Sequence, residues 1–139
     1  MQATVKWVDG VMFVGESGSG HAVVMDGPPD LGGRNMGIRP MEMLLIGVGG
    51  CSSFDVVQIL QKGRADLVGC VAELTAERVD AVPAVFSKIH VHFVVSGRDL
   101  KPAVVERAVK LSAEKYCSAA IMLGSAGVEM THDFEVIEV

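Results

Sequence analysis

The sequence predicts an α+β fold in which antiparallel sheets pack against helices. The hydrophobic pattern indicates three strands, a long helix, two strands, two helices and a last strand, in that order. Turns join the neighbouring strands, which favours hairpins over the long crossovers of a doubly wound parallel sheet. The 139 residues can bury one core, and no linker, repeat or low-complexity tract divides them. We therefore expect a single domain over residues 1–139.

The first 26 residues are predicted to form a meander of three strands. Apolar and polar residues alternate over 3–7, 11–16 and 21–25, with turns at 9–10 and 17–20. A loop with two prolines and four glycines follows over residues 27–39. A sheet this small needs a partner to cover its apolar face.

A long helix is predicted to begin at Pro40 and to end near Lys62, because proline is favoured in the first turn. Residues 43–60 carry a single charge and are long enough to span a membrane. We reject a membrane span, because Asp55, Gln58 and two serines lie in the second half of this segment. A helix that is apolar nearly all round also suits the centre of a soluble core or a contact with a second subunit. We therefore expect no membrane association and a homodimer.

The second half of the chain alternates between strands and helices. Strands are expected over 67–76 and 88–96, and Cys70 belongs to the apolar face of the first, together with Val68, Ala72 and Leu74. Asp99 is the expected cap of a second helix. A short helix near 117–123 and a last strand over 128–139 complete the predicted elements.

Composition excludes several classes of protein. The chain has 12 Lys and Arg against 17 Asp and Glu, a formal net charge of -5 and no basic cluster, so nucleic-acid binding is not expected. The N-terminus lacks the apolar core of a signal peptide, which predicts a cytoplasmic protein. Three cysteines in a reducing compartment do not form a disulfide framework, and they are more often buried, metal-binding or redox-active.

The long helix carries the first candidate site. Three glycines at positions 47, 49 and 50 each cost on the order of 1 kcal/mol of helix stability relative to alanine. Close packing against another element offsets this cost, or the bare backbone leaves room for a ligand beside Cys51; both remain open. The spacing of four polar positions forms one stripe along the helix, consisting of Cys51, Asp55, Gln58 and Lys62.

Cys117 is the second candidate, because it stands at the start of the predicted short helix. Unpaired N–H groups and the helix dipole favour a thiolate there. Burial as a small hydrophobe remains the alternative for both Cys51 and Cys117. His90 and His92 share the polar face of one strand, but a zinc site needs a third ligand that no motif supplies. His132 is expected to be a hydrogen-bonded core residue, and no metal or other cofactor is predicted.

Three motifs resemble the OsmC/Ohr family, and the likeness extends over essentially the whole chain. They are PMEMLL at 40–45, GGCS at 49–52 and AEKYCS at 113–118. The helix that begins Pro-Met-Glu is most similar to the OsmC-like subgroup. The resemblance implies an intertwined homodimer, with two long central helices wrapped by antiparallel sheets and active sites at the subunit interface.

The resemblance also implies a thiol peroxidase chemistry without metal or flavin. The helix cysteine, here Cys51, would attack an organic hydroperoxide, and the later cysteine, here Cys117, would resolve the sulfenic acid as an intramolecular disulfide. Thiols, often dihydrolipoyl groups, would then reduce the disulfide. The function predicted is thus oxidative stress defence by hydroperoxide reduction. The alternative is a non-enzymatic binder of a small apolar ligand in the interface pocket.

The supporting charges of the family peroxidases are displaced here. Those enzymes carry a glutamate directly after the proline and an arginine in a loop between early strands. In this sequence Glu42 comes one residue later, nine residues before Cys51, which places it on the opposite face of an ideal helix. The early turn at 17–20 has no arginine. Arg39, Glu42 and Asp55 are therefore the candidate supporting residues.

Overall fold

The computed structural model describes residues 1–139, which form two compact units over residues 1–44 and 45–139. The first unit contains the predicted meander: β1 (Ala3–Asp9), β2 (Met12–Ser17) and β3 (Ala22–Met25). The strands are antiparallel and lie in the order β1-β2-β3. The alternating pattern of the sequence therefore located all three strands to within two residues.

The loop after β3 is organised by the carboxylate of Asp26, which is 3% exposed. One carboxylate oxygen accepts a hydrogen bond from the N–H of Gly27 at 2.8 Å, and the other accepts from Arg34 and Met36, each at 3.1 Å. These bonds, that of Met36 foremost, lower the pKa of Asp26 and outweigh the opposing effect of burial. The charged carboxylate thus holds a loop that has little apolar packing of its own.

The long helix α1 (Pro40–Lys62) has the predicted bounds. Its buried residues lie on one stripe, in which an adjacent pair is followed at spacings of three and four: Val48, Gly49, Ser52, Val56 and Leu60. By length and composition alone α1 could cross a membrane, a property that core helices share. Its buried stripe packs in the second unit, where a Cβ added at Gly49 would lie 2.6 Å from Leu74 Cδ1. Close packing therefore explains this one glycine.

The sheet of the second unit contains β4 (Asp66–Arg78), β5 (Phe86–Arg98) and β6 (Glu129–Glu138), in the order β4-β5-β6. The first two strands form an antiparallel hairpin, but β6 runs parallel to β5, so the prediction of antiparallel sheets alone was wrong for this pair. The reason is a helical crossover between them, which returns the chain to the same end of the sheet.

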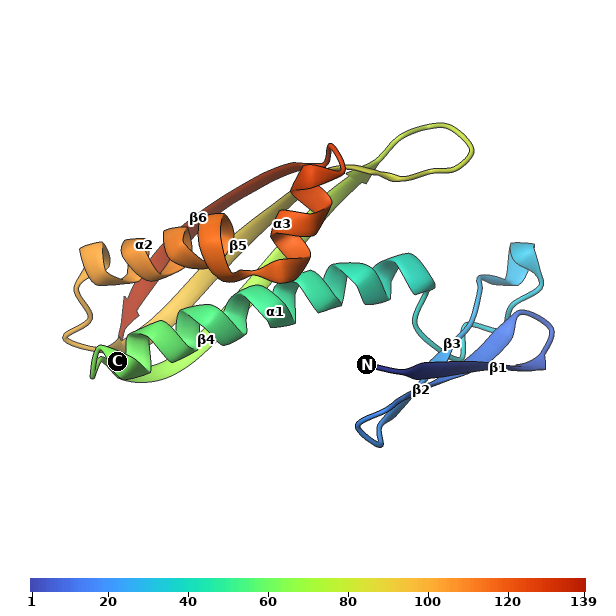
Figure 1. Ribbon diagram of the computed structural model, residues 1–139, viewed down its shortest axis with the longest axis horizontal. Coiled ribbons are helices and arrows are strands. Elements are labelled where there is room, and N and C mark those ends of the chain that lie inside the picture. The colour runs from blue at the N-terminus through green and yellow to red at the C-terminus, as the bar shows by residue number, and fades with distance from the viewer. The chain divides into compact units, whose positions relative to one another are not determined.

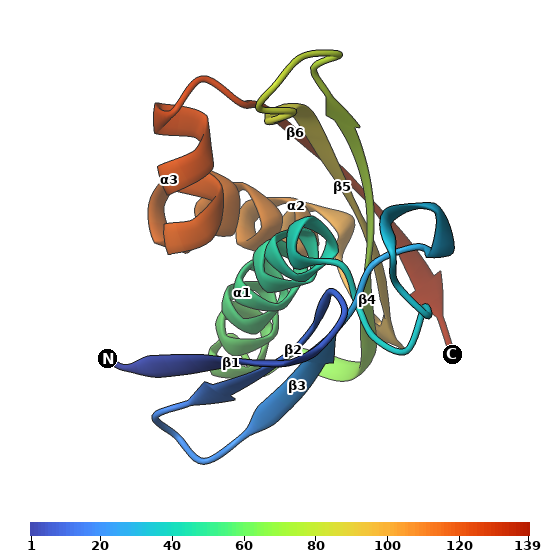
Figure 2. The same ribbon diagram turned by 90° about the vertical axis from the view of Figure 1, so that its right-hand side faces the viewer.

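The crossover consists of α2 (Pro102–Leu111), the π-helical turn η2 (Ser112–Tyr116) and α3 (Ser118–Ser125). Figures 1 and 2 show α1, α2 and α3 on one face of the β4-β5-β6 sheet. Alternate residues of β5 face these helices and form the core, consisting of Ile89, Val91, Phe93 and Val95. Asp99 was wrongly predicted to cap α2. It has a φ of +51°, and its N–H instead binds Glu138 Oε1 at 3.0 Å.

A β-bulge changes the predicted face of β4. The register shifts between Leu67 and Gly69, so Val68 leaves the apolar face and is 55% exposed. Cys70, Ala72 and Leu74 stay opposite the buried residues of β5. Cys70 is half-buried rather than fully enclosed, and burial raises the pKa of its thiol.

The opposite face of this sheet carries a histidine pair. His92 Nδ1 lies 2.6 Å from Asp133 Oδ1, and His90 Nε2 lies 3.1 Å from the same oxygen. His90 Nδ1 also contacts Thr131 Oγ1 at 2.7 Å. The hydrogen bond to Asp133 raises the pKa of His92, and the same bond lowers the pKa of Asp133.

We expect Asp26→Asn to destabilise the protein at neutral pH, because an amide offers only one acceptor oxygen to three N–H donors. The folded-state pKa of Asp26 is depressed, so its contribution is present above the ordinary value near 3.9 and is lost as pH falls. Denaturant unfolding should therefore show a gap between wild type and variant that narrows below about pH 4. Asp30→Asn, an exposed carboxylate of the same loop, is the control. A gap that is constant with pH would contradict this account.

We expect Asp133→Asn to lower the pKa of His92 toward the ordinary value of about 6.5. The raised pKa means that protonated His92 stabilises the folded state fully below that ordinary value, and that the contribution is lost as pH rises through the folded-state pKa. Titration of the imidazole resonances by NMR measures the shift. An unchanged His92 titration in the variant would rule out Asp133 as the cause.

Candidate thiol site

The second unit brings two of the three cysteines together. Cys51 lies half-buried in the middle of α1, and Cys117 is fully buried at the N-cap of α3. Both thiols are free, and Cys51 lies near enough to Cys117 to contribute to the raised pKa of the Cys117 thiol. Two cysteines 66 positions apart in the sequence are thus neighbours in the fold, which thiol–disulfide chemistry requires.

The sulfur of Cys117 accepts two hydrogen bonds. Ser52 Oγ donates to it at 3.0 Å, and the N–H of Ala120 in the first turn of α3 donates at 3.4 Å. Burial raises the pKa of Cys117, and the neighbouring thiol of Cys51 adds to this effect. The bonds from Ser52 and Ala120 act in the opposite direction but do not cancel it. The helix start thus supplies the predicted donor, while burial dominates the pKa.

Ser112 connects the two segments that carry the cysteines. Its hydroxyl donates to the carbonyl oxygen of Ser52 at 3.0 Å and lies 3.4 Å from Asp55 Oδ2. Its own carbonyl accepts the N–H of Cys117 at 2.8 Å, which closes the π-helical turn η2. Sequence reasoning missed Ser52 and Ser112. The position of each serine, one directly after Cys51 and the other five residues before Cys117, was the available signal.

The other predicted site residues have the following places. Asp55 reaches the thiol site through Ser112, whereas Lys62 at the far end of the polar stripe is exposed. Arg39 and Glu42 belong to the first unit. The Arg39 guanidinium donates to the carbonyls of Asp26 and Gly37, at 3.4 Å and 3.1 Å. Glu42 accepts the N–H of Arg39 at 3.2 Å, which caps the first turn of α1.

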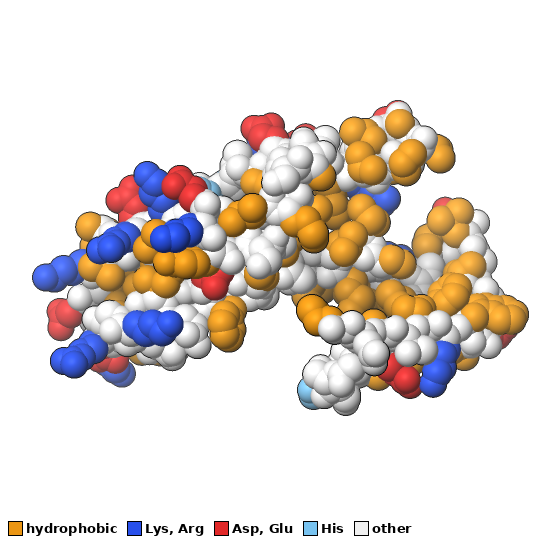
Figure 3. Space-filling view, viewed as in Figure 1, with side chains coloured by type: hydrophobic (Ala, Val, Ile, Leu, Met, Phe, Trp, Pro, Cys, Tyr) orange, Lys and Arg blue, Asp and Glu red, His pale blue; other side chains and the backbone are white.

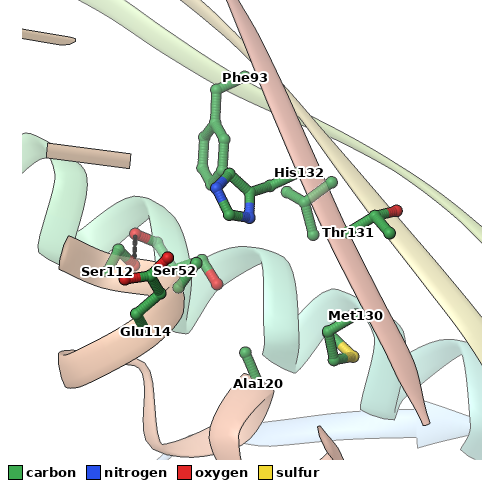
Figure 4. Close-up of a pocket in the computed structure, with 10 residues that line it drawn as sticks. Ser52, Phe93, Ser112, Glu114, Ala120, Met130, Thr131 and His132 are labelled. Carbon is green, nitrogen blue, oxygen red and sulfur yellow. Dashed lines mark hydrogen bonds between the residues drawn. The ribbon is translucent and has the colours of Figure 1, made fainter. Parts of the chain in front are cut away.

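A cavity of about 210 Å³ lies beside the two serines. Figure 4 shows His132, Phe93 and Met130 entering it from the sheet, and Ser112, Glu114 and Ala120 from the helical segments. His132 is exposed in this cavity, so the prediction of a hydrogen-bonded core histidine was wrong. His132 points toward the helices from β6, but its ring is solvent-exposed and makes no side-chain hydrogen bond.

No group of three or more His, Cys, Asp or Glu side chains has the arrangement that a metal ion needs. His90 and His92 both bind Asp133, but this trio does not meet the geometric requirement.

Comparison with known proteins identifies the family. A family model for OsmC-like proteins matches residues 32–133. Protein YhfA of Escherichia coli strain K12 is 56% identical over 140 residues, covering 99% of this chain and 98% of the relative. A solved structure from structural genomics is 54% identical, covers 100% of both chains and has a TM-score of 0.90.

A more distant structure shares the fold. The organic hydroperoxide resistance protein OhrB of Bacillus subtilis is 16% identical, with 97% of this chain and 98% of that chain covered and a TM-score of 0.62. The fold is consistent with a protein outside the membrane. By its family model and its close relative, the chain belongs to the OsmC/Ohr family.

Proposed function

We propose that this protein is a thiol-dependent redox protein that reduces organic hydroperoxides through Cys51 and Cys117 in the cytoplasm. Membership of the OsmC/Ohr family indicates a redox or peroxide-stress role. The observation that carries the finer proposal is that the fold makes Cys51 on α1 a neighbour of Cys117 at the N-cap of α3. Cys70 lies on a strand and takes part in no such pair.

The reaction proposed has three steps. The Cys51 thiolate attacks the terminal oxygen of the hydroperoxide, the O–O bond breaks, and the leaving alkoxide takes a proton to become an alcohol. Cys51 is then a sulfenic acid. The Cys117 thiolate attacks the Cys51 sulfur and expels hydroxide, which takes a proton to become water. A dithiol of the dihydrolipoyl class reduces the resulting disulfide, and no metal or other cofactor takes part.

Residues 1–139 are proposed to act as one OsmC-like domain within a homodimer, because large apolar surfaces of this chain are uncovered. Ile46 and Phe54 on α1 are 62% and 64% exposed, and only 28% of the apolar window of this helix is buried. A Cβ added at Gly47 or Gly50 would meet nothing within 4 Å. Figure 3 shows exposed hydrophobic side chains in the same view as Figure 1, together with charged side chains toward one end. A second copy, with its α1 against this one, would cover such a helix.

The alternative function is non-enzymatic binding of a small apolar ligand in the dimer-interface pocket. The observation that favours it is the full burial of Cys117, which raises the pKa of the thiol and so opposes thiolate chemistry at neutral pH. The two functions differ in whether the thiols are consumed by hydroperoxide.

We expect one equivalent of cumene hydroperoxide to convert wild type to the disulfide between Cys51 and Cys117. Cys117→Ser should react once and accumulate sulfenic or sulfinic acid at Cys51, and Cys51→Ser should be inert at the same dose. Disulfide formation in wild type should accelerate with pH, because burial raises the pKa of Cys117. Mass spectrometry of the quenched proteins reports each species.

Cys70→Ala is the matched control for these variants. It should leave the thiol chemistry intact and cost about 1 kcal/mol of stability, because a half-buried group is removed. Oxidation of Cys117 with Cys51 unmodified would reverse the two roles. Unmodified thiols in wild type would favour the ligand-binding alternative.

We expect Gly47→Ala and Gly50→Ala to weaken the dimer. In an isolated chain each change should stabilise the helix by about 1 kcal/mol, because the added methyl group meets nothing. In a dimer with its helices back to back, the same methyl groups would hold the backbones apart. Light scattering across a dilution series measures the mass. A folded wild type that is monomeric at micromolar concentration would contradict the dimer.

A further inference from the structure

A closed set of hydrogen bonds surrounds Cys117, and two serines supply its side-chain donors. Ser52 Oγ donates to Cys117 Sγ, Ser112 Oγ donates to the Ser52 carbonyl, and the Cys117 N–H donates to the Ser112 carbonyl. Both serine side chains are buried, and no buried side-chain polar atom is left without a partner. A hydroxyl that is held this way can donate to only one acceptor, and the acceptor here is a reacting sulfur.

We propose that the Ser52 hydroxyl is a catalytic group for the disulfide-forming step, in which it stabilises the attacking Cys117 thiolate, and that Ser112 is its positioning residue. This inference rests on the proposed redox function. In that step Cys117 loses a proton and its sulfur bonds to the Cys51 sulfur. The S–O bond of the sulfenic acid breaks, and the hydroxide that leaves takes up the proton as water. Ser52 keeps its own proton throughout.

No cationic group contributes to the pKa of Cys117, so neutral hydrogen-bond donors must stabilise its thiolate. On α1 the nearby titratable groups are Cys51 and Asp55, and on η2 and β6 they are Glu114 and His132, which line the cavity beside the serines. The neighbouring ammonium group, on Lys115, lies over the Tyr116 ring at 5.4 Å from its centre. The two donors to the sulfur are thus Ser52 Oγ and the Ala120 N–H. Of these, only the hydroxyl can be removed by substitution.

The test titrates Cys117 directly, without any hydroperoxide. In the double variant Cys51→Ala/Cys70→Ala, Cys117 is the only thiol, and the ultraviolet absorption of its thiolate is followed against pH. Adding Ser52→Ala should raise the midpoint by about one pH unit, because a hydrogen bond to the charged sulfur is lost. Adding Ser53→Ala, a change of the same kind at the next position on α1, should leave the midpoint in place. Ser52→Thr keeps the hydroxyl, so its thiolate midpoint should stay close to that of the double variant with Ser52 intact.

In the otherwise unmodified protein, Ser52→Ala should slow disulfide formation about tenfold at neutral pH. Trapping of the Cys51 sulfenic acid should show that the first step keeps its rate. An unchanged thiolate midpoint in Ser52→Ala, or a Ser52→Thr midpoint displaced as far as that of alanine, would overturn the role of the hydroxyl. If wild type forms no disulfide while Ser52→Ala still raises the midpoint, the hydroperoxide function fails and the effect of Ser52 on the thiol is upheld.

Discussion

The thiol site depends on the hydrogen bonds that connect α1 with η2 and Cys117. Ser52 and Ser112 are the buried polar side chains of the second unit, and each must find a partner, because an unpaired buried hydroxyl costs on the order of 1 to 3 kcal/mol. The Ser52 hydroxyl donates to the Cys117 sulfur, and the Ser112 hydroxyl donates to the backbone carbonyl of Ser52. The same bonds therefore hold η2 and Cys117 against α1, close to Cys51.

Burial and hydrogen bonding act against each other at Cys117. An apolar environment favours the neutral thiol, and the donors from Ser52 and Ala120 favour the thiolate. The balance remains on the side of the neutral thiol. The π-helical turn contributes to this placement, since such turns often occur where a helix must shift a functional side chain.

Exposed apolar surface is distributed differently in the two units. The side chain of Trp7 on β1 is 67% exposed, and its indole N–H closes the first turn at the carbonyl of Gly10. Three strands with uncovered apolar residues are marginal by themselves. The outer face of the β4-β5-β6 sheet, in contrast, carries the polar cluster of His90, His92 and Asp133.

The sequence alone determined most of the elements and singled out two candidate thiols. Hydrophobic periodicity placed the strands and α1, because each depends on residues only two to four positions apart. The motifs around Cys51 and Cys117 identified the candidate pair. Neither periodicity nor motif could find the parallel pairing of β6, the bulge that turns Val68 outward, or the exposure of His132.

Tertiary structure decided those features, because each depends on contacts between residues distant in the sequence. The bond from Ser52 to Cys117 spans 65 positions, and the bond from Ser112 to Ser52 spans 60. A helical pattern shows that Ser52 lies on the buried stripe but not which atom its hydroxyl meets there. The crossover between β5 and β6 determines that partner, because it places Cys117 against α1. The same placement determines which hydrogen bonds act on the pKa of the buried thiol.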